Sequence, residues 1–81
     1  MKNYVYILQS NSHPDEFYTG LCENLEKRLA DHNQGKSAHT SKHRPWRIVF
    51  HAWFEDPERA VAFEKYLKSG SGRAFASKRL R

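Results

Sequence analysis

The sequence has little of several features that mark secreted, membrane or disulfide-stabilised proteins. Cys22 is the only cysteine, so an intrachain disulfide and a cysteine-rich zinc site are both excluded. The longest clear apolar run, Tyr4 to Leu8, is too short for a signal peptide or a membrane span. Internal repeats and low-complexity tracts are absent as well. We therefore expect a cytoplasmic protein that keeps its thiol reduced.

What the sequence does contain fits a small basic domain. Its 81 residues leave room for one sheet and two or three helices, so we expect one domain spanning residues 1–81. The formal net charge is +5 and the pI is about 9.6. A basic excess favours polyanionic partners through phosphate contacts, although many small domains are basic without binding nucleic acid.

Three segments have the composition of strands. The first two, Tyr4–Leu8 and Phe17–Leu21, are joined by a polar turn that contains Pro14, which predicts an antiparallel hairpin. The third strand is expected at 46–54. Its alternating residues predict one apolar face, formed by Trp46, Ile48, Phe50, Ala52 and Phe54.

Two helices are marked by their capping residues. Asn24 is a suitable N-cap for a helix ending near Asn33, and Asp56 with Pro57 begins a second helix that ends near Ser69. Gly70-Ser71-Gly72 is expected to break that helix, and Phe75–Arg81 forms either a short last helix or a basic tail. The order β-β-α-β-α predicts an α+β fold, in which helices flank a small, largely antiparallel three-stranded sheet.

Both helices carry polar residues on the stripe that should face the core. In the first helix the stripe is Leu25, Arg28, Leu29 and His32, and in the second it is Ala60, Phe63, Glu64 and Leu67. Unpaired burial of such groups is costly, so they need partners, solvent or a ligand. The pattern leaves two interpretations open. In the structural one, Arg28 and Glu64 form a buried ion pair or reach water at the edge of the stripe. In the functional one, the polar groups line a cleft.

The hairpin adds aromatic residues to the same region. Tyr4 and Tyr6 share one face of the first strand, and Tyr18 and Gly20 share one face of the second. Tyrosines in strands usually serve only packing. A glycine inside a strand indicates a bulge or a close approach of another group to the backbone.

Taken in order, these residues resemble the GIY-YIG nuclease superfamily over nearly the whole chain. Tyr4-Val5-Tyr6 resembles the first motif and Tyr18-Thr19-Gly20 the second. Arg28, His32 and Glu64 match the polar residues of the family's two helices. The compact form is similar to the small stand-alone branch. Two positions depart from the pattern, because Tyr4 stands where the motif has glycine and no asparagine follows Asn33.

The resemblance implies a divalent-metal-dependent endonuclease, a hydrolase of phosphodiester bonds of the repair or recombination type, for which we expect DNA rather than RNA as the substrate. Glu64 would hold a single Mg²⁺ or Mn²⁺ ion, and one carboxylate with several waters suits Mg²⁺. Tyr6 would be the general base and Arg28 would favour its phenolate and hold phosphate oxygens. Tyr18 would donate to the phosphate or orient the water. His32 would bond a tyrosine or the phosphate.

A basic loop follows the first helix, at residues 36–45, and is expected to contact the nucleic-acid backbone. Phosphate contacts position a nucleic acid without reading its sequence. Because the chain has no separate DNA-binding domain, a protein partner is a second expected source of specificity. The loop residues predicted to bind nucleic acid are Lys36, His39, Lys42, His43 and Arg44. Lys78, Arg79 and Arg81 would extend this surface.

Three other functions fit parts of the sequence. In the first, the chain is a nucleic-acid-binding module, or a nuclease subunit that has little activity without its partner. In the second, it is an interaction protein with a decayed site, and the retention of the matched residues argues against this alternative. Finally, His39 and His43, with His32 and Cys22, suggest a zinc site, although they lack the spacing of a zinc-protease helix.

Overall fold

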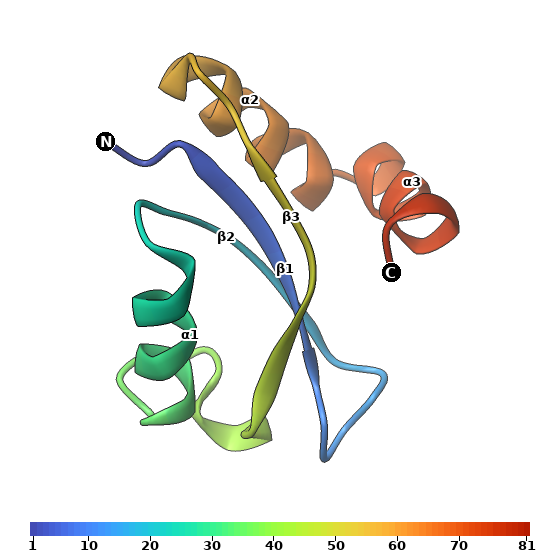
Figure 1. Ribbon diagram of the computed structural model, residues 1–81. Helices are drawn as coiled ribbons and strands as arrows, with labels where there is room; N and C mark the ends of the chain where they lie inside the picture. Colours follow the sequence, from blue (N-terminus) through green and yellow to red (C-terminus); the bar gives the residue numbers. More distant parts are fainter.

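The computed structural model describes residues 1–81 and contains one three-stranded antiparallel sheet (Figure 1). Its strands are β1 (Tyr4–Ser10), β2 (Phe17–Cys22) and β3 (Trp46–Trp53), in the order β2-β1-β3. The hairpin is confirmed, because β1 pairs antiparallel with β2. β1 is the central strand, which leaves β2 and β3 as the two edges.

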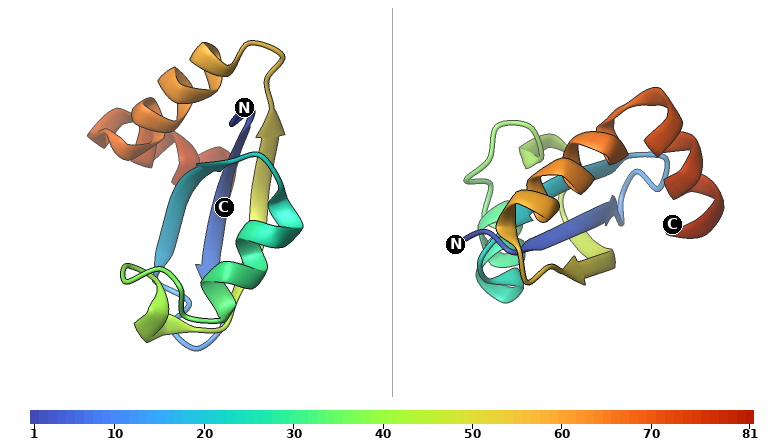
Figure 2. Two further views of the ribbon diagram at one scale, coloured as in Figure 1. Left: turned by 90° about the vertical axis from the view of Figure 1, so that its left-hand side faces the viewer. Right: turned by 90° about the horizontal axis from the view of Figure 1, so that it is seen from above.

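Helices cover both faces of the sheet, and the α+β class is confirmed (Figure 2). α1 (Leu25–Asn33) lies on one face, and α2 (Pro57–Lys68) and α3 (Gly70–Arg79) lie on the other. The loop after α1 contains one short 3-10 helix at Ser41–His43. None of the helices is both long and apolar enough to cross a membrane.

The alternation of side chains along β1 divides the apolar interior into two clusters. Val5 and Ile7 point toward α2 and α3, where they pack with Ala60, Leu67 and Ala76. Tyr6 and Leu8 point toward α1, where they pack with Cys22 and Trp46. Since neighbouring strand residues face opposite sides of a sheet, one strand supplies the centre of both clusters.

The prediction of a single apolar face on the third strand is wrong, because a β-bulge interrupts it. Ile7 pairs with Phe50 and Leu8 pairs with Ile48, so Val49 is the additional residue. A bulge shifts the alternation by one residue and sends later side chains to the other face. Ile48 therefore packs on the α1 side, whereas Val49 and Phe50 pack on the α2 side.

The predicted end of the second helix near Ser69 is confirmed, because α2 ends at Lys68, but Gly70-Ser71-Gly72 forms the first turn of α3 where a break was expected. α3 begins at Gly70, five residues before the expected Phe75, and only Ser69 separates it from α2. The Ser69 side chain caps α3 by accepting a hydrogen bond from the Gly72 backbone N–H at 3.1 Å. Gly72 lies directly against the carbonyl of Tyr66, so glycine serves close packing of the two helices here.

This packing predicts different effects for two substitutions in the same helix. A Cβ on Gly72 would overlap the Tyr66 carbonyl, whereas a Cβ on Gly70 meets nothing within 4 Å. We expect Gly72→Ala to lower the free energy of unfolding by roughly 2–4 kcal/mol, and Gly70→Ala to change it by less than about 1 kcal/mol. Urea denaturation measures both, and equal effects would contradict the close approach.

Candidate active site

The Tyr6 hydroxyl lies at the centre of a buried hydrogen-bond network. Tyr6 is 2% exposed on the central strand. Its Oη atom lies 2.9 Å from Nε2 of His32, and it accepts a hydrogen bond from Nε of Arg28 at 3.3 Å. Two polar residues of the α1 stripe are thus hydrogen-bonded to the tyrosine that the resemblance assigns to the first motif.

The local sequence of α1 explains this meeting. Asn24 caps the helix by accepting a hydrogen bond from the Lys27 backbone N–H at 3.0 Å, and Leu25 and Leu29 pack against the sheet. Arg28 and His32 are four residues apart, so both point from the same side of the helix. The packing of the two leucines therefore turns the guanidinium and the imidazole toward Tyr6.

Gly20 makes room for the hydroxyl on the neighbouring strand. It pairs with Tyr6 across β1 and β2, and a Cβ at this position would lie 2.5 Å from Tyr6 Oη. Of the two interpretations of this glycine, the close approach is the one observed. Tyr18 lies beside the same group, with its ring centre 6.3 Å from that of Tyr6 and 5.0 Å from that of His32.

The electrostatics of the network keep Tyr6 protonated in the absence of substrate. Burial raises the pKa of Tyr6 to about 12, and the hydrogen bond and positive charge of Arg28 only partly oppose this rise. Burial, together with the positive charge of Arg28, lowers the pKa of His32 to about 4, so the imidazole is neutral at pH 7. The expected effect of Arg28 is therefore present, but burial outweighs it.

These protonation states determine the direction of each hydrogen bond. Arg28 can only donate, so the Tyr6 proton has one acceptor, Nε2 of His32. The neutral ring then carries its own proton on Nδ1, which lies 2.7 Å from the hydroxyl oxygen of Thr40. Thr40 in turn faces the carbonyl of Ser37 at 3.5 Å. Each group thus donates a hydrogen bond to the next along one chain: Arg28, Tyr6, His32, Thr40 and the Ser37 carbonyl.

Thr40 is the site residue that the sequence analysis missed. Both His32 and Thr40 are fully buried, and the indole N–H of Trp46 donates to the Thr40 carbonyl at 2.7 Å. Thr40 lies in a loop without periodicity, so neither a helical stripe nor a strand pattern indicates its contact with α1. Its position is fixed by the loop's packing against the start of β3.

Glu64 lies on α2, on the opposite face of the sheet from α1, and forms no hydrogen bond or ion pair with Tyr6, Arg28 or His32. Its carboxylate pairs with Nζ of Lys68 at 2.5 Å, and the same Nζ lies 5.9 Å from the ring centre of Tyr18. No Arg28–Glu64 ion pair forms, so that interpretation of the two helical stripes is wrong. The Glu64 side chain is 13% exposed, which leaves it accessible at the edge of the sheet.

The predicted nucleic-acid-binding loop divides into two groups of residues. Lys36 pairs with Asp31 at 3.3 Å, Nε of Arg44 donates to the Ser41 carbonyl at 2.9 Å, and His43 stacks edge-on against His13. These three side chains hold the loop together. Lys42 and His39 are exposed and make no side-chain hydrogen bond within the protein.

The donor set limits which metal the site can hold. No group of three or more His, Cys, Asp or Glu side chains is arranged to bind a metal ion, so the zinc alternative has no site in this fold. Glu64 is the carboxylate that the resemblance assigns to a metal ion, and here it pairs with Lys68 on the same helix. A single carboxylate fits a hard ion that retains most of its waters.

The chain matches the GIY-YIG catalytic domain over residues 2–78 and belongs to this nuclease family. It resembles a UPF0213 protein of Clostridium perfringens, with 40% identity over 67 residues, 82% of this chain and 70% of the relative. A UPF0213 protein of Staphylococcus haemolyticus is 37% identical over 71 residues, covering 86% of this chain and 84% of the relative.

A solved structure has the same fold. The solution NMR structure of a UPF0213 protein from Bacillus halodurans, BH0048, superposes with a TM-score of 0.56 at 30% identity, and the match covers 96% of this chain and 84% of that one. The match to the family over residues 2–78 includes every residue of the network described above. The chain is therefore similar to small GIY-YIG proteins of the UPF0213 group in both sequence and fold.

The proton order predicts a specific histidine tautomer. We expect His32 to carry its proton on Nδ1, as read from the ¹⁵N shifts of its ring. Thr40→Val leaves that N–H without an acceptor, at a cost of about 1–3 kcal/mol, and moves the proton toward Nε2. Thr40→Ser keeps the hydroxyl and serves as the control. An Nε2–H ring in the unsubstituted protein would contradict the assigned order.

The lowered pKa of His32 predicts how stability depends on pH. A histidine whose pKa falls from 6.5 to about 4 on folding stabilises the neutral form, so its contribution is complete above pH 6.5 and is lost as pH falls toward 4. We expect the difference in free energy of unfolding between the protein and His32→Gln to shrink from pH 7 to pH 4.5. A constant difference would show that His32 titrates normally when folded.

Proposed function

We propose that the protein is a divalent-metal-dependent endonuclease that hydrolyses phosphodiester bonds of nucleic acid, with DNA as the proposed substrate and a role in repair or recombination. The observation that carries the proposal is the Tyr6 hydroxyl held between Arg28 and His32 on a chain that matches the GIY-YIG catalytic domain. The basic charge and the exposed residues Lys42 and His39 support nucleic-acid contact. We place this activity in the cytoplasm.

Tyr6 is assigned as the general base, acting together with His32. A water molecule at Tyr6 Oη would give its proton to the phenol oxygen while the phenol passes its own proton to Nε2 of His32. Tyr6 is then a phenol before and after the transfer, so the phenolate, which burial makes costly, need not accumulate. The water oxygen forms the new bond to phosphorus.

Substrate charge makes His32 a better acceptor at the moment it is needed. The positive charge of Arg28 lowers the pKa of His32, and a bound phosphodiester would offset that charge. Arg28 would also hold a phosphate oxygen through its planar group, and Tyr18 would donate to the phosphate or orient the water. A bound phosphodiester would therefore raise the pKa of His32 by offsetting the Arg28 charge, which is the second cause of its lowering after burial.

Glu64 would hold one Mg²⁺ or Mn²⁺ ion. When bound, the ion supplies Lewis-acid stabilisation of the phosphate and the leaving oxygen. Lys68 occupies the Glu64 carboxylate here, and it would move to a phosphate or to solvent when the ion binds. A partner protein that supplies substrate specificity remains part of the proposal, because the chain is short and presents little surface for reading bases.

Cleavage of labelled single-stranded, duplex, flap and junction DNA, and of matching RNA, tests the function. We expect cutting that requires Mg²⁺ or Mn²⁺ and that Tyr6→Phe and Glu64→Gln each reduce by about 10²-fold or more. Tyr4→Phe and Glu58→Gln are matched controls, because Tyr4 shares the strand and face of Tyr6 and Glu58 is exposed on α2.

Two outcomes would contradict the assignment. Full activity of Tyr6→Phe would remove Tyr6 from the chemistry. The second outcome is that the protein binds the substrates but cleaves none of them, and that Tyr6→Phe and Glu64→Gln bind with the same affinity as the unsubstituted protein. This outcome would support a binding module or a subunit that requires its partner.

A further inference from the structure

Two surface clefts lie along the edge strand β2, one at each end. The first, of about 300 Å³, is lined by the start of β2 together with the end of α2, α3 and the C-terminal arginine. The second, of about 360 Å³, is lined by the end of β2, the start of α1 and the segment before β1. β2 has no neighbour on its outer side, so both clefts open on an unpaired edge.

Each cleft contains one residue of the candidate active site. Tyr18 lines the first cleft and Arg28 lines the second. Gly20 lies between them on β2 and touches the Tyr6 hydroxyl. A strand that followed β2 from one cleft to the other would therefore pass over the hydroxyl. The six residues of β2 extend about 20 Å, which is long enough to meet several backbone phosphates.

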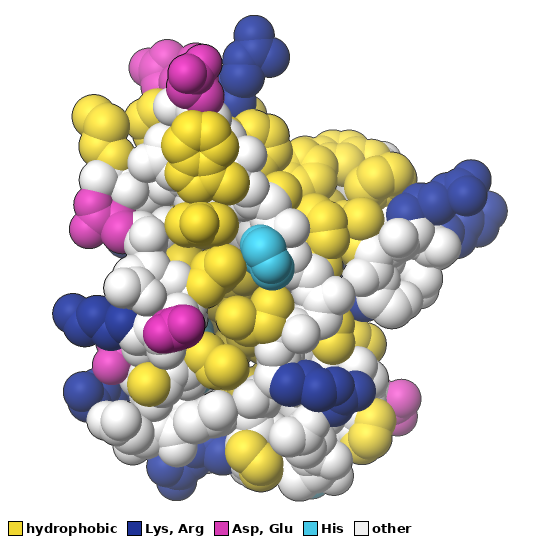
Figure 3. All heavy atoms as spheres, in the orientation of Figure 1, with side chains coloured by type: hydrophobic (Ala, Val, Ile, Leu, Met, Phe, Trp, Pro, Cys, Tyr) yellow, Lys and Arg dark blue, Asp and Glu magenta, His cyan; other side chains and the backbone are white.

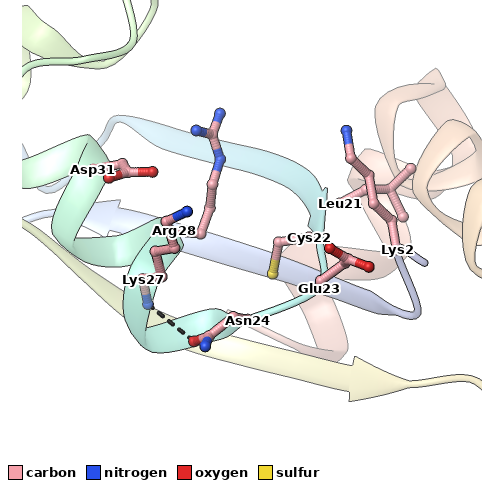
Figure 4. Close-up of a pocket in the computed structure, with 8 residues that line it drawn as sticks. All are labelled: Lys2, Leu21, Cys22, Glu23, Asn24, Lys27, Arg28 and Asp31. Atoms are coloured by element: carbon pink, nitrogen blue, oxygen red, sulfur yellow. Dashed lines mark hydrogen bonds between the residues drawn. The ribbon is translucent and has the colours of Figure 1, made fainter.

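The charges of the clefts suit a polyanion. The first cleft contains Lys68, Arg73 and Arg81 and no acidic residue. The second contains Lys2, Lys27 and Arg28 with two acids, but Glu23 pairs with the amino terminus and Asp31 pairs with Lys36. In Figure 4, the Lys2 and Arg28 side chains extend on either side of the open space beside β2.

Four of these cations have no acidic partner in the protein and are exposed: Lys2, Lys27, Arg73 and Arg81. Arg81 also lies over the ring of Phe17, with its guanidinium carbon 4.0 Å from the ring centre, which places it at the mouth of the first cleft. The opposite side of the molecule is different. In Figure 3, apolar side chains run along β3, and Lys and Arg side chains form no continuous patch.

We propose that the outer edge of β2 binds the backbone of the nucleic-acid strand that is cut. Lys2 and Lys27 contact phosphates on one side of the scissile phosphate, and Arg73 and Arg81 contact phosphates on the other. The proposal rests on the nuclease function, and it assigns the principal contact surface to the β2 edge, with Lys42 and His39 of the 36–45 loop as secondary contacts.

Binding of a short labelled single-stranded DNA, followed by fluorescence anisotropy in EDTA over a range of salt concentrations, tests the surface apart from catalysis. The variants are Lys2→Gln with Lys27→Gln, and Arg73→Gln with Arg81→Gln. The control is Arg59→Gln with Lys65→Gln, which removes the same charge from the exposed part of α2. Circular dichroism checks that each variant is folded.

We expect each β2-edge pair to weaken binding about tenfold at low salt and to reduce the slope of log K against log salt by about 1.4, the value for two lost phosphate contacts on a single strand. The control pair should change binding less than about twofold. In cleavage, the β2-edge pairs should raise KM and leave kcat nearly unchanged, since these residues lie outside the reacting group.

A further variant, Lys42→Gln, removes an exposed charge from the 36–45 loop. Equal weakening by the control pair, or weakening by Lys42→Gln with none by the β2-edge pairs, would overturn the β2-edge surface. The measurements also distinguish failure of this surface from failure of the proposed nuclease function. Normal cleavage that depends on Glu64, with unchanged binding by the β2-edge variants, would retain the nuclease and reject this surface. Absence of nucleic-acid binding by the unsubstituted protein would reject both.

Discussion

The buried hydroxyl of Tyr6 is the constraint on which the arrangement of this molecule depends. A hydroxyl on the central strand of a small sheet needs hydrogen-bond partners, because an unpaired polar group in the interior costs on the order of 1–3 kcal/mol. The partners come from α1, which must therefore lie against this face with Arg28 and His32 turned inward. His32 then needs its own partner, and Thr40 ties the following loop to the helix.

The same constraint links structure to chemistry. The network that satisfies Tyr6 also leaves its proton directed at a neutral imidazole and places a permanent cation on the oxygen. Glycine at position 20 keeps the adjacent strand clear of that oxygen. Satisfying a buried polar group and preparing a proton path are therefore achieved by the same contacts, which explains why so small a chain can hold a preorganised site.

Much of this could be predicted from sequence, because the signals are local. Periodicity located the strands and the first two helices, and the misplaced Arg28, His32 and Glu64 indicated the polar site. Three features could not be predicted from such patterns. The bulge at Val49 interrupts an alternation that looks continuous, and α3 continues from Gly70 because Ser69 caps it and Gly72 packs against the Tyr66 carbonyl. Thr40 is brought to His32 only by tertiary packing.

The central claim is that a phosphodiester binds beside the Tyr6 hydroxyl. A crystal structure of the Glu64→Gln variant with a bound DNA strand tests this most directly. Our account predicts a phosphate in contact with Arg28 and Tyr18, close to Tyr6 Oη, with the strand following β2. A strand bound elsewhere, with the Tyr6 network closed and no phosphate near Arg28, would contradict it.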